Sequence, residues 1–192
     1  MKPMSAATSR LKSETRRKRR WTEGDLLDLP DDGRKYELVN GNLVEVPTGM
    51  RHGEIAVELT IKIYSYAKPW AIVYDSSTGF RTVRGNIRSP DVSVMRKERL
   101  PEGKSPIGFA DGTPDLAVEI ISPSEKTSDI LEKIAEYFES GTQEVWLLFP
   151  ERKQVHRYTV NLEVQVLNEN DILKGEPILP GFEVRVGDLF AE

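Results

Sequence analysis

Residues 115–121 (DLAVEII) constrain the fold of this chain more than any other segment. Five of these seven residues are apolar, and an apolar run without alternation is typical of a strand that is buried on both faces. A second apolar run, residues 145–149, follows after a segment with helical periodicity. The two runs predict the central strands of a sheet, with one helix between them in the chain.

The remaining pattern predicts an α+β fold. Asn40-Gly41 joins two β-rich runs and predicts an N-terminal hairpin. Apolar spacing predicts a helix over residues 51–67, and Thr22 is expected to cap a short helix before the hairpin. Ser122-Pro123-Ser124-Glu125 predicts a capping box at the start of a helix that ends at about Ser140. Further strands are expected at 71–75, 79–84, 91–95, 154–159, 162–167 and 182–186. We therefore expect a mixed sheet flanked by helices, with antiparallel strands near the C-terminus.

Composition excludes several kinds of site. The chain has no cysteine, which excludes disulfides, a thiolate nucleophile and cysteine-held zinc. Its two histidines, His52 and His156, cannot form a site of several histidines. Metal chemistry would rest on carboxylates, which suit Mg²⁺ or Mn²⁺. No apolar run approaches the roughly 20 residues of a membrane helix, and no secretory signal is visible, so we expect a cytoplasmic protein.

Charge is distributed unevenly along the chain. Residues 1–20 hold eight basic residues and one acid, whereas residues 21–192 hold 19 basic and 30 acidic residues. The polar, aperiodic composition of residues 1–20 predicts a disordered basic arm, and residues 21–192 are expected to form one folded domain. Such an arm is either a solvated tail or a tether to nucleic acid.

Three acidic residues lie in apolar strand contexts: Glu37, Asp91 and Glu119. Burial of an unpaired carboxylate is unfavourable, so we expect these residues to pair with a cation or to bind a metal. Two carboxylates from adjacent strands and a backbone carbonyl are suitable ligands for Mg²⁺. Lys133 borders the apolar stripe of the following helix, which suggests that its amine reaches a carboxylate. The alternative is a purely structural ion pair of Lys133 with Asp129 or Glu119.

A second Pro-Asp pair, Pro114-Asp115, offers an alternative to Asp91 as the carboxylate that would bind a metal together with Glu119. Asp115 precedes Glu119 by four residues in one strand, which separates them by about 13 Å. That distance is too long for one shared ion, so Asp91 is the expected ligand.

An ordered series of motifs covers roughly residues 21–190. It consists of Tyr36-Glu37-Leu38-Val39-Asn40-Gly41, His52, Pro90-Asp91-Val92, Pro114-Asp115-Leu116-Ala117-Val118-Glu119-Ile120-Ile121-Ser122-Pro123-Ser124, Asp129, Lys133, Tyr137, Gly141, Glu144-Val145-Trp146-Leu147 and Leu179-Pro180-Gly181-Phe182. This series resembles the Uma-two family, a branch of the PD-(D/E)XK restriction-endonuclease-like superfamily.

The resemblance implies a restriction-endonuclease-like fold and metal-dependent hydrolysis of phosphodiester bonds in DNA, with Mg²⁺ or Mn²⁺ as cofactor. By position, Asp91 and Glu119 would ligate the metal together with the backbone carbonyl of Ile120. The superfamily lysine normally lies two residues after the second acid, where this chain has Ile121. Lys133 on the following helix would take its place and orient the attacking water.

The resemblance also implies secondary roles. Glu37 would be a further acid near the metal or a water, and His52 would contact a substrate phosphate or Glu37.

Arg81, Arg84 and Arg88 either hold DNA phosphates or form a solvated strand face. A homodimer is expected because double-strand cleavage needs two sites. The alternative function is a catalytically inactive module on the same fold that binds nucleic acid or protein.

Overall fold

The structure is a computed structural model, and it describes residues 19–30, 32–46, 49–161 and 163–190. The basic arm predicted for residues 1–20 lies outside the described residues, apart from its last two. Arg19 pairs with Asp25, and the guanidinium of Arg20 donates to the carbonyl of Asn40.

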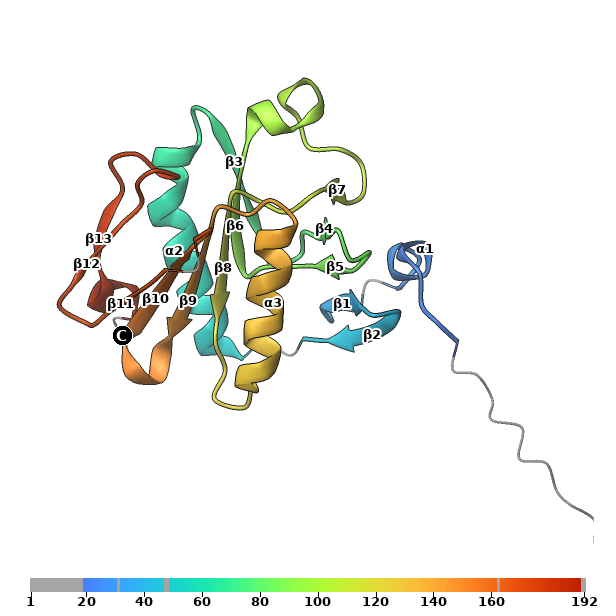
Figure 1. Ribbon diagram of the computed structural model, residues 1–192, viewed down its shortest axis with the longest axis horizontal. Coiled ribbons are helices and arrows are strands. Elements are labelled where there is room, and N and C mark those ends of the chain that lie inside the picture. The colour runs from blue at the N-terminus through green and yellow to red at the C-terminus, as the bar shows by residue number, and fades with distance from the viewer. Residues whose placement is uncertain (1–18, 31, 47–48, 162, 191–192) are drawn as a thin grey trace, which may run out of the picture.

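A six-stranded sheet forms the centre of the molecule, with the strand order β11-β10-β9-β8-β6-β3 (Figure 1). Its strands are β3 (Ala71–Asp75), β6 (Val92–Arg96), β8 (Leu116–Ile120), β9 (Glu144–Phe149), β10 (Gln154–Thr159) and β11 (Val164–Leu167). β8 and β9 pair in parallel, and the other neighbours pair antiparallel. All residues of β8 are buried, which confirms the prediction of a central strand covered on both faces.

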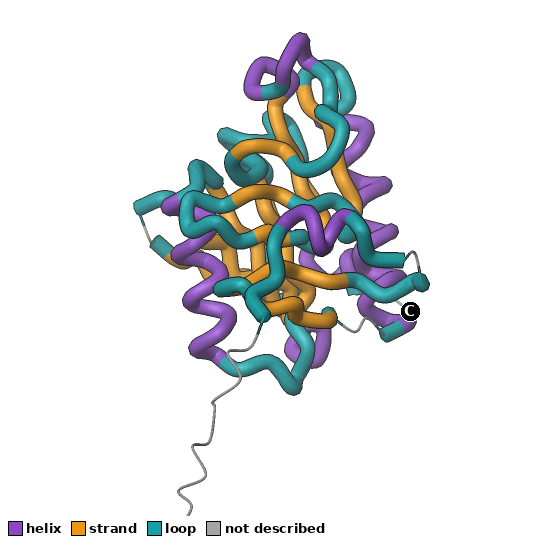
Figure 2. Tube along the Cα trace, turned by 90° about the vertical axis from the view of Figure 1, so that its right-hand side faces the viewer, coloured by secondary structure: helices purple, strands orange, loops and turns teal. Residues whose placement is uncertain are grey.

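Two helices cover opposite faces of this sheet. The helix α2 (Met50–Ala67) lies on one face and α3 (Thr127–Glu139) on the other, so that helices flank the strands on both sides in Figure 2. Side chains alternate along β8. Val118 therefore packs in the cluster that contains the buried residues of α2, whereas Ala117 packs in the cluster that contains Ile134 and Tyr137 of α3. Glu119 follows on the α3 side.

A smaller sheet lies beside the central one, in the order β2-β1-β5-β4-β7 (Figure 1). Its strands are β1 (Tyr36–Val39), β2 (Asn42–Glu45), β4 (Phe80–Arg81), β5 (Ile87–Arg88) and β7 (Ala110–Asp111). The predicted hairpin is confirmed: Asn40 and Gly41 have φ values of 53° and 74°, the left-handed conformation that its tight turn requires. The strand expected over 79–84 is much shorter, because Gly85 N–H donates to the carbonyl of Thr82 and the chain turns back as β5.

The remaining elements are short. As predicted, Thr22 caps α1 (Glu23–Leu27), and it also forms a capping box with Asp25. β12 (Ile172–Lys174) pairs with β13 (Glu183–Arg185), and 3-10 helices lie at Lys97–Arg99, Pro101–Gly103, Pro150–Arg152 and Val186–Leu189. The central sheet, with α2 and α3 on its two faces, confirms the predicted α+β fold with a mixed sheet flanked by helices. None of the described helices is long and apolar enough to cross a membrane.

The start of α3 differs from the prediction. Ser122 N–H donates to the carboxylate of Glu125, and Glu125 N–H donates to the carbonyl of Ser122. These bonds close a separate turn. Lys126 follows with an extended backbone, so the helix begins only at Thr127.

Candidate active site

A cavity of about 520 Å³ lies where the β1–β2 hairpin, the start of α2, the end of β8 and α3 meet. It is lined by all five side chains predicted to be catalytic, and by Ile120. Those side chains are Glu37, His52, Asp91, Glu119 and Lys133. The volume lies in the range of small-ligand sites, roughly 300–1,000 Å³. The fold therefore brings together residues that are up to about a hundred positions apart in the sequence.

Strand register explains why the two principal acids meet. β6 and β8 are antiparallel, with Val92 opposite Val118. Extension of this register by one residue places Asp91 next to Glu119. The backbone N–H of Ile120 donates to Oδ2 of Asp91 at 2.8 Å, and the N–H of Asp91 donates to the carbonyl of Val118 at 3.0 Å.

Asp91 is 4% exposed and is surrounded by positive and polar groups. Nζ of Lys35 donates to Oδ1 at 3.2 Å. Nε2 of His52 lies 3.0 Å from the same oxygen, at an angle outside hydrogen-bond geometry. Burial alone would raise the pKa of Asp91, but the nearby His52, Lys35 and Ile120 N–H lower it to about 2. Asp91 is therefore ionised at neutral pH.

Glu119 receives two partners from one face of α3. Lys133 and Tyr137 are four residues apart, so their side chains lie on the same side of the helix. Nζ of Lys133 donates to Oε2 of Glu119 at 3.0 Å, and the hydroxyl of Tyr137 donates to Oε1 at 2.6 Å. Burial raises the pKa of Glu119, whereas the surrounding carboxylates outweigh burial for Lys133 and raise its pKa.

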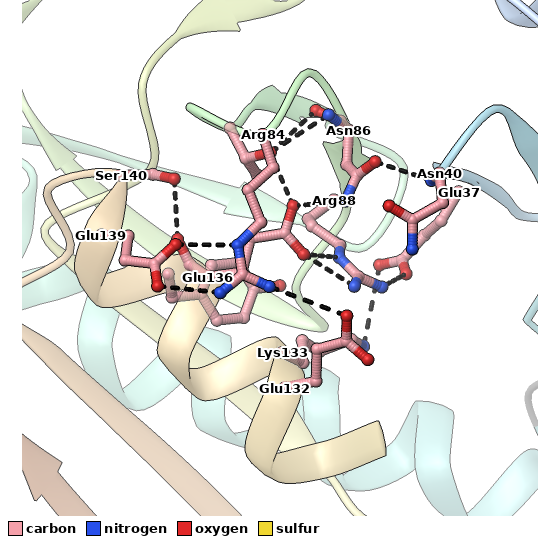
Figure 3. Close-up of polar contacts among 12 residues, drawn as sticks. Glu37, Asn40, Arg84, Asn86, Arg88, Glu132, Lys133, Glu136, Glu139 and Ser140 are labelled. Carbon is pink, nitrogen blue, oxygen red and sulfur yellow. Dashed lines mark hydrogen bonds and ion pairs between the residues drawn. The ribbon is translucent and has the colours of Figure 1, made fainter. Parts of the chain in front are cut away.

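Glu37 is held from the smaller sheet. β1 and β5 pair with Leu38 opposite Ile87, which places Glu37 next to Arg88. Oε1 of Glu37 accepts a hydrogen bond from Ser89 N–H at 2.9 Å, and Oε2 accepts one from Nη1 of Arg88 at 3.0 Å. Nζ of Lys133 lies 3.7 Å from Oε1 (Figure 3). Burial would raise the pKa of Glu37, but Lys133 and Arg88 outweigh it and lower the pKa.

The oxygen atoms at the centre of the site are suitable ligands for a hard divalent cation. Asp91, Glu119 and the carbonyl of Ile120 all offer oxygen, the ligand that Mg²⁺ prefers, and Mg²⁺ commonly keeps several water ligands. Within the described ranges, no three His, Asp or Glu side chains lie close enough to form a metal cluster by themselves. Water and the backbone carbonyl would thus have to complete the coordination.

The cavity also has a charged rim. Its exposed lining residues include four carboxylates, Glu45, Glu125, Asp129 and Glu132, and one lysine, Lys126. This acidic rim favours the approach of a cation and opposes the approach of a polyanion unless counter-ions are present.

The three arginines proposed for DNA contact are all paired with carboxylates. Arg81 binds Glu23 and Asp111, and Arg84 binds Glu139. Contact of these two arginines with DNA remains a prediction.

Arg88 requires a correction. It is 7% exposed, and its guanidinium binds Glu37 and Glu136. Because two buried carboxylates use its donors, it does not form a surface for DNA phosphates.

Sequence reasoning missed two residues of this region, Lys35 and Glu136, and it assigned no contact to Tyr137. Lys35 precedes Glu37 by two positions, and the hairpin ladder extends to it because Val46 N–H donates to its carbonyl. Alternation along the strand could therefore have placed Lys35 on the face of Glu37. Glu136 lies three positions after Lys133, a spacing that also predicts a shared helix face.

Asp115 lies outside the cavity. It accepts hydrogen bonds from Arg96 N–H and from Gln143, each at 2.8 Å, and Arg99 lies 3.2 Å away. Its partners are those of a structural ion pair, and the choice of Asp91 as the metal ligand stays a prediction.

A mixed sheet between helices, with two acids at the ends of adjacent strands and a lysine beside the second acid, defines a restriction-endonuclease-like protein. The chain belongs to the Uma2 family, which is described as "Putative restriction endonuclease" and whose model matches residues 24–187. This match confirms the resemblance found in the sequence.

The fold is similar to that of a solved structure. It is a protein from Anabaena variabilis ATCC 29413, described as "a putative nuclease belonging to DUF820". The TM-score is 0.75 and the identity 24%, over 88% of this chain and 97% of that chain. At this identity the similarity shows the fold. No curated protein matches the chain.

Proposed function

We propose that this protein is a metal-dependent endonuclease that hydrolyses phosphodiester bonds of DNA, with Mg²⁺ or Mn²⁺ as cofactor. One observation carries the proposal: Asp91 and Glu119 lie side by side at the cavity, and Lys133 Nζ lies 3.0 Å from Glu119. Membership of the Uma2 family supports the same class of reaction.

Each residue has a role that follows from its contacts. Asp91, Glu119 and the Ile120 carbonyl would hold the cation, which when bound would supply positive charge for the developing phosphorane and acidify a water. Lys133 is fixed by Glu119 and Glu37, so its ammonium can orient a water and offset negative charge in the transition state. Tyr137 holds the second oxygen of Glu119 and keeps that carboxylate in one orientation.

The acidic rim also favours a metal requirement. Glu45, Glu125, Asp129 and Glu132 would repel a DNA backbone at the cavity mouth. Divalent cations in this region would relieve the repulsion. Arg81 and Arg84, at the neighbouring strands, are the proposed DNA contacts, and a homodimer would supply two cleavage sites.

A second candidate function is a binding module without turnover. The observation in its favour is that Asp91, Glu37 and Glu119 each contact a lysine or arginine in this structure. Such pairing is what a purely structural ion network would show.

Incubation with supercoiled plasmid, single-stranded DNA and RNA distinguishes the two functions. Wild type, Glu119→Gln and Glu144→Gln are compared in Mg²⁺, in Mn²⁺ and in EDTA. Glu144 is a suitable control because it is buried and paired with Arg157 but lies outside the cavity. The proposal predicts metal-dependent DNA cleavage by wild type and Glu144→Gln but not by Glu119→Gln. Binding of DNA without cleavage by wild type would favour the binding module.

A further inference from the structure

A buried carboxylate outside the cavity is linked to the candidate active site. Glu136 of α3 has an exposed fraction of 0% and does not line the cavity. Its Oε1 accepts hydrogen bonds from Thr82 at 2.6 Å and from Asn86 at 2.7 Å. Its Oε2 accepts a hydrogen bond from Nε of Arg88 at 2.8 Å (Figure 3).

Arg88 connects this carboxylate to the site. Nη2 of Arg88 lies 2.7 Å from Glu136, and Nη1 lies 3.0 Å from Glu37. Glu37 in turn lies 3.7 Å from Nζ of Lys133, which lies 3.0 Å from Glu119. The four side chains from Glu136 to Lys133 therefore form one uninterrupted series of ion pairs (Figure 3).

The series is closed by the helix itself. Lys133 and Glu136 are three residues apart on α3, so one rigid element carries both ends of the series. The smaller sheet carries the two middle members, Glu37 on β1 and Arg88 on β5. A change in any one member would thus alter how α3 presents Lys133 to the cavity.

Stability alone is a weak explanation for such a series. Burial of charges is costly, and well-packed apolar residues can often replace a buried ion pair without loss of stability. What apolar residues would not provide is a directed contact between Arg88 and Glu37, which turns the Glu37 carboxylate toward Lys133.

We propose that Glu136 is a positioning residue of the candidate active site. Through Arg88 it fixes Glu37 against Lys133, and it thereby holds the Lys133 ammonium at Glu119. This inference rests on the proposed nuclease function, because it assigns Glu136 a role in that reaction.

The test uses Glu136→Gln, which keeps the shape of the side chain and removes its charge. The matched control is Glu144→Gln, because Glu144 is likewise buried and paired with an arginine, Arg157. A conservative variant, Glu136→Asp, keeps the charge on a shorter side chain. For each variant, cleavage kinetics are measured on DNA, Mn²⁺ affinity by titration calorimetry, and unfolding by urea.

Glu136→Gln is expected to lower kcat at least tenfold relative to Glu144→Gln, with KM and Mn²⁺ affinity within twofold of the wild-type values. Glu136→Asp should recover part of the loss. In the Glu37→Gln background, Glu136→Gln should lower kcat by less than twofold, because its effect passes through Glu37. An undiminished effect in that background, or equal losses in Glu136→Gln and Glu144→Gln, would overturn the proposal.

Urea unfolding separates this proposal from the nuclease function. If wild type does not cleave nucleic acid, the nuclease function fails and the positioning role of Glu136 in that reaction fails with it. The ion-pair series is still tested, because the destabilisations of Glu37→Gln and Glu136→Gln should then be non-additive. Additive destabilisations would overturn the coupling between the two carboxylates.

Discussion

Nζ of Lys133 on α3 lies 3.0 Å from Oε2 of Glu119 on β8, although the two residues are fourteen positions apart. The usual position of the superfamily lysine holds Ile121, which packs in the apolar cluster beneath α3. In this chain an ammonium reaches Glu119 from the helix that covers this cluster. We propose that Lys133 serves in place of the superfamily lysine.

Replacement of Lys133 tests its role in the reaction. Lys133→Met should lower DNA cleavage by about 100-fold or more, because one preorganised group that stabilises the transition state is lost. Mn²⁺ should still bind in titration calorimetry, since Asp91 and Glu119 remain. Cleavage at the wild-type rate by folded Lys133→Met would contradict the role given to this lysine.

The low pKa of Asp91 predicts how stability depends on pH. The folded pKa of about 2 lies below the ordinary value of 3.8, so the ionised carboxylate stabilises the folded state. This contribution is fully present above the unfolded value and is lost as the pH falls from about 4 toward 2. In urea titrations, the difference in unfolding free energy between wild type and Asp91→Asn should be constant at neutral and mildly acidic pH and should shrink below about pH 4. A difference that stays the same at about pH 3 would contradict this linkage.

The fold is expected to persist without metal. Lys35, Arg88 and Lys133 offset the charges of Asp91, Glu37 and Glu119, so each of these three buried carboxylates has a positive partner. Protein treated with EDTA should therefore unfold cooperatively in a thermal melt. Added Mg²⁺ should raise Tm in wild type, because a ligand that binds the folded state stabilises it. Loss of cooperative unfolding in EDTA would show that the metal is needed for folding.

Two aspartates offer a matched comparison. Asp115 and Asp91 are both buried, and each follows a proline in the sequence. Asp115→Asn should lower stability, because Arg99 and Arg96 N–H lose a charged partner, while metal binding stays intact. Asp91→Asn should abolish metal binding. Calorimetry with Mn²⁺ on both variants decides which aspartate is the metal ligand. Loss of Mn²⁺ binding in folded Asp115→Asn would contradict the choice of Asp91.

The sequence predicted the elements whose signals are local. Residues 115–121 and the Asn40-Gly41 turn gave a buried strand and a hairpin, and both are present as β8 and the β1–β2 pair. The capping box at Ser122 failed because the same hydrogen bonds also close an isolated turn. Sequence propensity does not distinguish a capping box from an isolated turn. Here the next residue, Lys126, is extended, so the helix does not start from this turn.

The candidate site was predictable where burial demanded a partner. Burial predicted that Glu37, Asp91 and Glu119 would each need a cation or a metal and that Lys133 would reach a carboxylate. The resemblance to the family implied that these four residues share one site. The role of Arg88 was not predictable, since nothing in its own segment shows that Glu136, forty-eight positions later, lies behind it. Such contacts depend on how the smaller sheet packs against α3, which only the three-dimensional structure shows.

Titration calorimetry with Mn²⁺ tests the central claim, that Asp91 and Glu119 form the metal site of a nuclease. Wild type, the double variant Asp91→Asn/Glu119→Gln and the control Glu144→Gln are compared under the same conditions. We predict that wild type and Glu144→Gln bind the ion and that the double variant, shown to be folded by circular dichroism, does not. Equal binding by wild type and the double variant, or no binding by wild type even with uncleavable DNA present, would contradict the claim.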